Sequence, residues 1–528
     1  MTVVESFHGL TPHVTEDLLR DLEARADVSS VDRDPIDVVA PFNLHVIGTV
    51  PQAIDEDVRS AAARARAAQP EWAALGARRR ARVLLRFHDL LLKNVDELTD
   101  LIQLEAGKAR LDAWKEVVDT VGITRFFAKM TPKVTGRRRH QGAMPLFTKT
   151  YEHRHPKGLV GFISPWNYPF NLSISDALGA LATGNAVLIK PDEKTPYSPL
   201  YAARLLEKAG MPRDLVQVVT GAGAPIGRVI VDEVDYIMFT GSTEVGRRIA
   251  EMAGRRLIGC SMELGGKNAA IVLPDADMTR TVRELAAGSH ANAGQTCVAM
   301  ERVYVHESIR QEFTARFVEY AASMPMTTAF DFSGELSSLI DQTQVDRVHA
   351  HVEDAVAKGA TLLTGGKPRP DVGPLFYAAT VLTDVTEDMS VCREETFGPV
   401  TAIYGYTDIL EAIEAANDSE LGLHFSLWTR DTSRALDIAR RLEAGSITVN
   451  DGLVASWGSH EAPMGGMKDS GLGRRHGLEG ILKFTESQTV AVQRLVPAYS
   501  PFGGISVDRF TRLIQFLTRV FRRLPFYK

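Results

Sequence analysis

Short apolar runs that alternate with helical segments are the feature that most constrains the fold of this chain. After Pro156 these runs end at Gly or Pro, and segments with helical spacing separate them. The runs are GLVGFISP, NAVLIKP, VQVVTG, YIMFTG and NAAIVLP. Strands of a parallel sheet have this pattern when helices cover both faces, because neither face meets water. The sequence therefore predicts a parallel α/β sheet.

A second series of apolar runs follows and predicts a second α/β domain. Its members are RVYVH, TLLTGG, VTAIYGY, FSLWTR and GSITVN. Ahead of both series, residues from about 55 to 130 have helical spacing, and their first half is rich in alanine and arginine. We interpret the run RRRAR in that half as a solvated helix face, because leucines follow it at helical spacing.

Other patterns flank these regions. The first thirty or so residues predict a polar, acidic helix and a linker. Segments 147–156 (FTKTYEHRHP) and 488–496 (QTVAVQRLV) alternate apolar and polar residues. This alternation predicts exposed strands that pair with each other or with another subunit.

Length and charge narrow the classes of function. A chain of 528 residues is too long for one ordinary core and predicts two or three domains. Its 60 basic and 66 acidic residues give a formal net charge of −6, which excludes a globally basic nucleic-acid binder. The start, MTVVESFHGL, lacks the basic and apolar regions of a signal peptide, and no apolar stretch reaches the roughly 18–20 residues that span a bilayer. We therefore expect a cytoplasmic protein.

One of the three cysteines has unusual neighbours. The three lack CxxC spacing, so they predict neither a disulfide framework nor a zinc site, and they suit a reducing compartment. Cys297 lies in NAGQTCVAM, between small and polar residues. Because a lone cysteine is usually a buried and inert small hydrophobe, a reactive thiol needs support from other parts of the chain.

Two motifs after predicted strands suit a nucleotide. In FTGSTEVGRRIAEMAG a strand enters a Gly-Ser-Thr turn and a helix leaves it, and a helix N-terminus presents free N–H groups to a phosphate. The alternative is an ordinary turn with a Ser or Thr cap. In VLIKPDEKTP, Lys190 and two carboxylates follow a strand at the end where open α/β sheets bind ligands. They suit the hydroxyls of a ribose, or form a surface ion pair on a solvated loop.

Three further motifs carry groups that suit catalysis. Asn167 in SPWNYP can aim its amide at a developing oxyanion, or it belongs to a rigid aromatic turn. Glu263 in SMELGGKN has apolar neighbours that raise a carboxyl pKa toward the range of a general base, or it is a salt-bridged structural glutamate. EETFGPV adds another carboxylate and an aromatic ring.

Taken in order, these motifs resemble the signature series of the aldehyde dehydrogenase superfamily. The series is SPWNYP, KPDEKTP, FTGSTEVG, MELGGKN, GQTC, EETFGPV and PMGGMKDSGLGRRHG. The resemblance covers about residues 40 to 495. Through SWGSHEAPMGGM and GRRHGLEG the chain looks most like a second bacterial type of succinate-semialdehyde dehydrogenase.

The resemblance implies an α/β fold with a Rossmann-like cofactor domain, a catalytic α/β domain and a small β oligomerisation arm. The expected divisions are an N-terminal extension (1–35), a cofactor-binding domain (36–137 and 158–264, with 459–485 returning to it), a catalytic domain (265–458), the arm (138–157 and 486–498) and a basic amphipathic tail (499–528). The expected assembly is a homodimer or a homotetramer.

The resemblance also implies a mechanism without a metal. Cys297 is the expected nucleophile, which attacks an aldehyde to give a thiohemiacetal and, after hydride loss, a thioester. Asn167 and the backbone N–H of Cys297 are expected to hold the oxyanion. Glu263 is expected to activate the water that releases the acid. Cys260 and Cys392 match no catalytic position, and we interpret both as structural.

The family pattern assigns a further set of residues to an NAD or NADP cofactor. These are Trp166, Lys190, Glu193, Gly227, Gly241, Ser242, Leu264, Glu395 and Phe397. Lys190 and Glu193 match contacts to the adenosine ribose, and Gly241 with Ser242 matches the pyrophosphate site. NAD is favoured and NADP is the alternative, because the carboxylate of Glu193 would repel a 2′-phosphate.

Two positions depart from the better-characterised succinate-semialdehyde enzymes. Those enzymes grip the substrate carboxylate with arginines where this chain has Ser175 and Ala291. A buried charged end normally needs a cationic partner or several hydrogen bonds. Succinate semialdehyde and an uncharged aliphatic or aromatic aldehyde are therefore both candidate substrates.

Other classes of function are weaker interpretations. A CoA-acylating aldehyde dehydrogenase has no need of a water-activating group such as Glu263. A structural protein that retains the scaffold has no need of Cys297, Asn167 and Glu263 together. A cysteine hydrolase would need a histidine paired with Cys297, and His290 is near it only in sequence.

The tail, DRFTRLIQFLTRVFRRLPFYK, predicts a basic amphipathic helix. Its apolar stripe consists of Phe510, Leu513, Ile514, Leu517, Val520 and Leu524, and arginines supply charge elsewhere. Such a helix docks on the enzyme or on a neighbouring subunit, or it lies on an anionic membrane surface.

Overall fold

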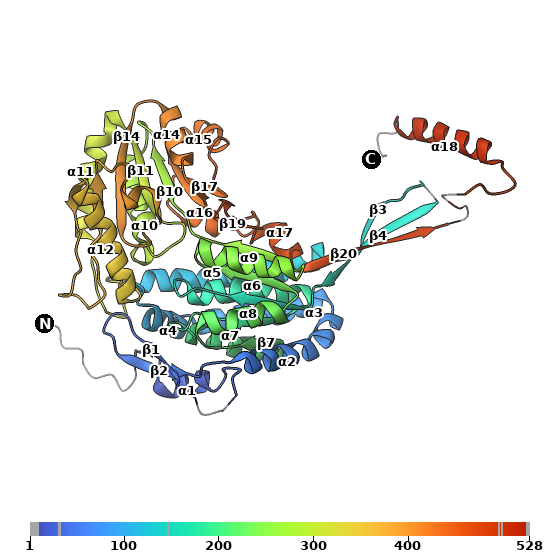
Figure 1. The fold of residues 1–528 in the computed structure, drawn as a ribbon, viewed down its shortest axis with the longest axis horizontal. Coiled ribbons are helices and arrows are strands. Elements are labelled where there is room, and N and C mark those ends of the chain that lie inside the picture. Colours follow the sequence, from blue (N-terminus) through green and yellow to red (C-terminus); the bar gives the residue numbers. More distant parts are fainter. Residues whose placement is uncertain (1–9, 30–32, 145–146, 495–496, 498–499, 524–528) are drawn as a thin grey trace.

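Two helix-flanked sheets form the body of the chain, and a narrow β arm with a terminal helix projects from it (Figure 1). The structure is a computed structural model that describes residues 10–29, 33–144, 147–494, 497 and 500–523.

The first sheet has six strands in the order β19-β9-β8-β5-β6-β7. The four pairings from β9 to β7 are parallel, and β19 runs antiparallel to β9. Its strands are β5 (Leu159–Ile163), β6 (Ala186–Lys190), β7 (Val216–Val218), β8 (Tyr236–Thr240), β9 (Gly259–Glu263) and β19 (Gly471–Leu472). The helices that follow its strands are α6 (Pro169–Thr183), α7 (Tyr197–Lys208), α8 (Gly223–Glu233) and α9 (Thr243–Arg255), with the 3₁₀ turn η1 (Arg213–Leu215) before β7.

Four helices precede this sheet and share its core. They are α2 (Asp55–Ala74), α3 (Ala77–Lys93), α4 (Val95–Ala106) and α5 (Arg110–Val134). The RRRAR run lies at the start of α3, and one of its arginines departs from the expected solvated face. Arg80 is buried, and its guanidinium donates to the carbonyls of Ala182 at 2.9 Å and Ala73 at 2.8 Å. These carbonyls lie close to the C-terminal ends of α6 and α2, where helix carbonyls lack intrahelical partners.

The second sheet has seven strands in the order β12-β13-β14-β11-β10-β16-β17. They are β10 (Asn268–Val272), β11 (Met300–His306), β12 (Thr361–Thr364), β13 (Thr380–Thr383), β14 (Val400–Tyr406), β16 (His424–Trp428) and β17 (Ser446–Val449). The flanking helices are α10 (Met278–His290), α11 (Glu307–Ser323), α12 (Gln342–Ala357), α14 (Ile409–Asn417) and α15 (Thr432–Ala439). Short elements in the same region are η2 (Ala291–Gly294), α13 (Ser390–Arg393), β15 (Leu421–Gly422), α16 (Val454–Trp457) and β18 (Met467–Lys468).

One predicted strand lies in a different sheet from the one that its pattern suggested. The run NAAIVLP was grouped with the first series, but it forms β10, which pairs with β11 and β16 of the second sheet. The first sheet is completed instead by β9, whose sequence GCSME is less apolar. An apolar run indicates that both faces of a strand are buried. It does not indicate to which sheet the strand belongs.

The two alternating segments pair with each other, as one of the predicted alternatives stated. β4 (Thr148–Pro156) lies antiparallel to β20 (Thr485–Gln493), with Tyr151 opposite Val490, and β3 (Arg138–Gln141) pairs with the other edge of β4. Figure 1 shows this three-stranded sheet extending away from the body. The helix α17 (Gly477–Leu482) leads the chain into β20.

The N-terminal region is more closely packed than the predicted acidic helix and linker. After α1 (Glu16–Glu23), the strands β1 (Ile36–Val39) and β2 (Val46–Val50) form a hairpin. Leu19 and Leu22 of α1 are buried, and Asp21 pairs with Arg204 of α7 at 3.2 Å. The acidic residues seen in the sequence therefore cover a buried apolar face.

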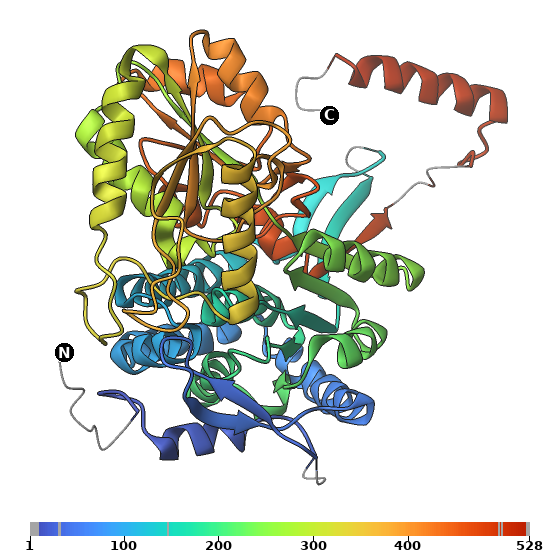
Figure 2. The ribbon, with the colours of Figure 1, turned by 60° about the vertical axis from the view of Figure 1, so that its left-hand side comes forward.

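The C-terminal helix α18 (Val507–Phe521) forms where the tail pattern predicts it. In both views it stands apart from the two large sheets (Figures 1 and 2). Phe510 is buried against Phe502, while Leu513 and Val520 are exposed, and Leu524 lies outside the described residues. Within the described chain, no helix is long and apolar enough to cross a membrane.

Candidate active site

The motifs singled out in the sequence converge on one cavity between the two large sheets. Its volume is about 220 Å³, and it opens where β5, β8 and β9 end. The sequence-predicted residues that line it are Trp166, Asn167, Gly241, Ser242, Glu263, Leu264, Cys297, Glu395 and Phe397. Sequence reasoning missed Pro165, Thr240, Gly265, Gln344 and Arg347, which line the same cavity.

The segment before Cys297 is held in an unusual backbone conformation. Asn292 and Ala293 have φ values of 52° and 54°, in the left-handed region that non-glycine residues seldom adopt. Gln295 fixes this bend, because its amide donates to the carbonyls of Asn292 and Ser338 and accepts from the N–H of Ile340. These hydrogen bonds fix the backbone immediately before Cys297.

The amide of Asn167 faces the same segment. Its Nδ2 donates to the Gln295 carbonyl at 3.0 Å, and the residue is 3% exposed. Next to it, the rings of Trp166 and Phe397 meet edge to face with centroids 5.5 Å apart. The motifs SPWNYP, GQTC and EETFGPV thus contribute neighbouring side chains although they are far apart in the chain.

The Cys297 thiol lies in an acidic and poorly hydrated environment. Burial, with the nearby carboxyls of Glu395 and Glu263, raises the pKa of this thiol to about 12. Its carbonyl accepts from Asn268 Nδ2 at 2.8 Å. Gly266 approaches so closely that a Cβ there would lie 2.4 Å from this carbonyl oxygen. Gly266 of MELGGKN therefore allows the chain to pass beside Cys297.

Glu263 is the carboxylate with the fewest bonds in the cavity. Burial raises its pKa to about 7, and the charge of Arg475 opposes this rise. Its Oε1 is buried and finds no hydrogen-bond partner among the described residues. A buried carboxyl with a free oxygen and a pKa near neutrality has the properties of a general base.

Arg475, in the motif PMGGMKDSGLGRRHG, is a buried cation to which the sequence analysis assigned no role. It donates to Ser175 Oγ at 2.8 Å and pairs with Asp176 at 2.7 Å. Lys483 also pairs with Asp176, at 2.9 Å. Arg475 and Lys483 thus both pair with the Asp176 carboxylate.

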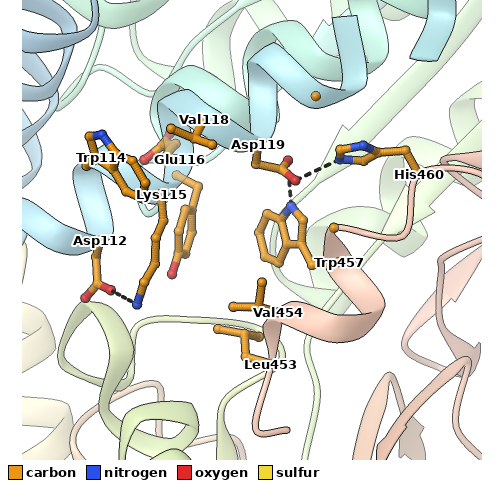
Figure 3. A pocket seen from close by; sticks show the side chains of 13 residues that line it. Asp112, Trp114, Lys115, Glu116, Val118, Asp119, Leu453, Val454, Trp457 and His460 are labelled. Atoms are coloured by element: carbon orange, nitrogen blue, oxygen red, sulfur yellow. Dashed lines mark hydrogen bonds and ion pairs between the residues drawn. The ribbon is translucent and has the colours of Figure 1, made fainter. Parts of the chain in front are cut away.

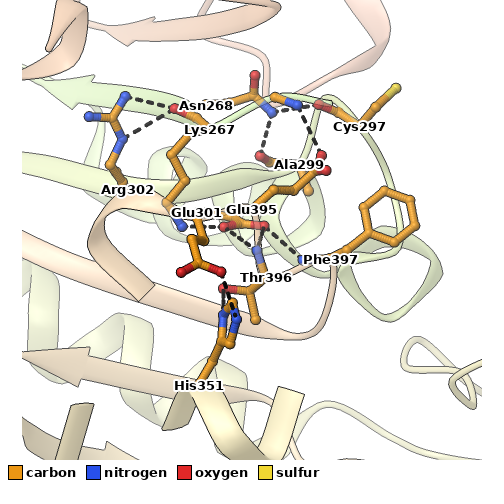
Figure 4. Close-up of polar contacts among 12 residues, drawn as sticks. Lys267, Asn268, Cys297, Ala299, Glu301, Arg302, His351, Glu395, Thr396 and Phe397 are labelled. Atoms are coloured by element: carbon orange, nitrogen blue, oxygen red, sulfur yellow. Dashed lines mark hydrogen bonds and ion pairs between the residues drawn. The ribbon is translucent and has the colours of Figure 1, made fainter. Parts of the chain in front are cut away.

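A buried ion pair positions the EETFGPV segment (Figure 4). Glu301 pairs with Lys267 and accepts from the N–H groups of Thr396 and Phe397 at 3.0 Å. Glu395 accepts from Gly266 N at 2.9 Å, and burial raises its pKa to about 7. The sequence analysis missed both Lys267 and Glu301. MELGGKN contains Lys267, but nothing in the sequence shows that Glu301 is its partner.

Three predicted cofactor residues lie outside this cavity. Lys190, at the end of β6, is buried and donates to Glu193 at 3.2 Å, and a Cβ on Gly223 of α8 would lie 3.6 Å from its Nζ. Gly227 on α8 borders open space, since a Cβ there would meet no atom within 4 Å.

The residues present fit a dinucleotide. Ser242 is the N-cap of α9, so Gly241 and Ser242 lie at a helix N-terminus that suits a pyrophosphate. Glu193 precedes this turn in the sequence and Glu395 follows it. Their carboxylates suit ribose hydroxyls. Among the described residues, no group of three His, Cys, Asp or Glu side chains is placed to hold a metal ion.

A second cavity, of about 380 Å³, lies between α5 and residues 451–460 (Figure 3). Leu453 and Trp457 line it and also belong to the apolar cluster that contains Cys297. Tyr168, which follows Asn167, is another wall. Cys297 lines the first cavity, and the second cavity lies beside the apolar cluster that contains Cys297. The sequence analysis did not find the second cavity.

His290 has no role in this geometry. It is fully buried, its Nδ1 bonds to the Ala286 carbonyl at 3.0 Å, and its ring packs on Phe317. Burial lowers its pKa to about 4. These contacts do not support a Cys–His hydrolase pair.

The match to a family model agrees with this geometry. Residues 28–490 match the model of the aldehyde dehydrogenase family, and the chain belongs to that family. It is an oxidoreductase that acts on aldehydes with NAD or NADP as acceptor, and its α/β fold class is confirmed.

Three similar proteins place the chain within the family. A protein of Mycolicibacterium smegmatis named putative succinate-semialdehyde dehydrogenase [NADP(+)] is 47% identical over 507 residues, covering 96% of this chain and 98% of the relative. The structure of a betaine aldehyde dehydrogenase from Staphylococcus aureus in complex with NAD⁺ is 31% identical, with a TM-score of 0.86 and coverage of 92% and 99%. An NADP-dependent enzyme of Escherichia coli is 33% identical, with a TM-score of 0.83 and coverage of 87% and 95%.

The electrostatics of Cys297 lead to a testable prediction. In the enzyme without added cofactor, iodoacetamide should modify Cys297 at pH 8 at least about tenfold more slowly than it does in the unfolded chain, because few thiols are ionised. Glu395→Gln should speed the reaction by removing a nearby negative charge. Glu394→Gln, a change at the exposed neighbour, is the control. Peptide mass spectrometry measures each cysteine separately, and equal rates in all three proteins would contradict this account.

Proposed function

We propose that the chain oxidises an aldehyde to a carboxylic acid through a covalent intermediate on Cys297. The observation that carries the proposal is the meeting of three groups at one cavity: the Cys297 thiol, the Asn167 amide and the Glu263 carboxyl. Each suits a different step, and together they suit acyl chemistry on sulfur.

The residues divide the reaction as follows. The Cys297 thiol loses its proton to solvent and its Sγ attacks the aldehyde carbon, while Asn167 Nδ2 with the backbone N–H of Cys297 stabilises the resulting oxyanion. The nicotinamide, when bound, supplies the acceptor for the hydride that leaves this carbon. Glu263 then takes a proton from water, which attacks the thioester and frees the acid from Cys297. A CoA-acylating reaction is the alternative, and the free oxygen of Glu263 favours hydrolysis.

Replacement of the two reacting groups should separate the two halves of the reaction. Cys297→Ser should abolish turnover and leave dinucleotide binding largely intact, because a serine alkoxide is far less accessible than a thiolate. Glu263→Gln should give a stoichiometric burst of reduced cofactor and then little turnover. Stopped-flow absorbance measures both phases. The matched controls are Cys260→Ser and Glu251→Gln, and normal steady-state rates in the Cys297 or Glu263 variant would refute its role.

The pH dependence should follow Glu263. Only the ionised carboxylate accepts a proton. The rate of thioester hydrolysis should therefore increase as the pH is raised through about 7 and decrease as the pH is lowered through it. Burial disfavours the carboxylate, which places this inflection above the ordinary range of a glutamate.

We propose that the enzyme prefers NAD to NADP. Glu193 is held by Lys190 at the end of β6, and its carboxylate would lie against a 2′-phosphate. The sequence relative at 47% identity is named an NADP(+) enzyme, and NAD⁺ is printed for a structural neighbour at 31% identity, so the proposed preference rests on Glu193.

A cofactor comparison tests this preference. The kcat/KM with NAD should exceed that with NADP by about tenfold, because the carboxylate of Glu193 would repel the 2′-phosphate of NADP. Glu193→Ser should narrow the ratio, while Glu244→Gln, on the exposed side of α9, should not. A higher kcat/KM for NADP in the unchanged enzyme would overturn the preference.

We propose that the arm and α18 form contacts between copies of this chain and give a homodimer or a homotetramer. We also propose that the enzyme works in the cytoplasm. Leu513, Phe516 and Val520 expose an apolar face on α18, and β3 and β20 are the outer strands of the arm. The free thiols of all three cysteines suit a reducing compartment. The alternative for α18 is an anionic membrane surface, which its arginines suit.

Deletion from Arg509 onward distinguishes these roles. We expect a smaller oligomer by light scattering and no change in sedimentation with vesicles that contain anionic lipid. Replacing Leu513, Phe516 and Val520 with serine should have the same effect, whereas Arg519→Gln with Arg522→Gln should not. Unchanged mass with lost vesicle binding would favour the membrane.

A further inference from the structure

The second cavity presents mainly apolar surface to the chain of an aldehyde. Its apolar walls are Trp114, Val118, Tyr168, Leu453, Val454 and Trp457. Trp457 and Tyr168 pack with ring centroids 5.3 Å apart, beside the cluster that contains Cys297. An aldehyde whose carbonyl carbon reaches Sγ would therefore lie along aromatic and aliphatic side chains.

The polar groups of this cavity are already bonded to each other (Figure 3). Asp119 accepts from Trp457 Nε1 at 2.8 Å, Asn171 Nδ2 at 2.7 Å and His460 Nε2 at 2.9 Å. Burial acts to raise the pKa of Asp119, but the bonds from His460 and Trp457 outweigh it and hold this pKa below its usual range. Asp119 is thus an ionised carboxylate that uses the indole and imidazole donors facing the cavity.

Two other carboxylates line the same space. Asp112 accepts from Asn292 N at 2.8 Å, and Lys115 lies 3.4 Å from it at the partly exposed rim. Glu116 pairs with the buried Lys108. Among the described residues that line the cavity, three carboxylates thus face one lysine, and that lysine has a carboxylate partner. A substrate carboxylate would meet these like charges, and Lys115, the one lysine among the described lining residues, already pairs with Asp112.

Two other cations, Arg475 and Lys483, do not supply a free positive charge. Arg475 and Lys483 are both bonded to Asp176, and neither lines the cavity. The Arg475 guanidinium reaches Ser175 from the Glu263 side. An aldehyde that ends in a carboxylate would have to break these buried bonds to gain a cation, which is costly.

Asp119 also fixes the shape of the cavity. Its bonds to Trp457 and His460 tie residues 454–460 to α5. His460 can approach because residue 122 is glycine, and a Cβ there would lie 2.5 Å from His460 Cε1. Trp457 is therefore held in one orientation against the substrate path.

We propose that this cavity selects an uncharged, apolar aldehyde over one that ends in a carboxylate, and that Trp457, held by Asp119, is a specificity-determining side chain. The inference rests on the proposed function, because it requires the aldehyde carbon to react at Cys297. The relative named for succinate semialdehyde shares the family chemistry, whereas the lining of this cavity determines the substrate.

A panel of four aldehydes tests the inference with the full-length enzyme. Pentanal and succinate semialdehyde differ chiefly in the charged end, 4-(trimethylammonio)butanal carries the opposite charge, and propanal is too short to depend on the far wall. The kcat/KM for pentanal should exceed that for succinate semialdehyde by about tenfold or more. Trp457→Phe removes the indole donor and should raise the KM for pentanal with a smaller change in kcat.

A charge placed in the cavity provides the converse test. Leu453→Arg should improve succinate semialdehyde relative to pentanal by about tenfold. Leu436→Arg, at an exposed position of α15, should leave the ratio unchanged. A preference of the unchanged enzyme for succinate semialdehyde or for the cationic aldehyde would overturn the inference while propanal oxidation upholds the proposed function. Absence of oxidation with every aldehyde would refute the proposed function itself.

Discussion

Buried carboxylates that accept hydrogen bonds from backbone N–H groups hold the active site together. Glu116 accepts from Phe170 N and Asn171 N, which fixes the start of α6 just after Asn167. Glu105 does the same at the start of α7 for Tyr197 N and Ser198 N, and Glu301 does so beside Glu395. A buried N–H or carboxylate without a partner is costly, so each bond removes two penalties at once. Hydrogen bonds from the backbone to buried carboxylates therefore fix the turns on which the site residues lie.

Burial away from water also controls the pKa values of the ionisable groups in the cavity. Burial raises the pKa of Cys297 to about 12 and the pKa values of Glu263 and Glu395 to about 7. Each ionised carboxylate makes a thiolate less favourable, so the three groups titrate as a coupled set. Arg475 is the opposing charge, and Asp176 neutralises part of it. The reactivity of Cys297 is therefore controlled by the charge state of its neighbours.

Local patterns in the sequence predict the strands, because strand periodicity involves residues close in the chain, and the family resemblance supplies the arm and most of the residues around Cys297. Four features were not predictable in this way. The sheet that contains β10, the burial of Arg80, the Lys267–Glu301 pair and the bonds from Asp119 to residues 457 and 460 all depend on contacts between distant segments. The local sequence around an arginine or a tryptophan does not indicate which distant residue will contact it.

This division bears on what similarity to relatives can establish. Cys297, Asn167 and Glu263 lie in compact motifs, so a family match extends to the type of reaction. The second cavity is assembled mainly from α5 and residues 451–460, which are far apart in sequence, and Tyr168 of SPWNYP adds one wall. Substitutions on either segment can change its charge without disturbing the backbone bonds that hold Cys297. Reaction type and substrate choice are therefore physically separable in this fold, and a relative with 47% identity constrains the first more tightly than the second.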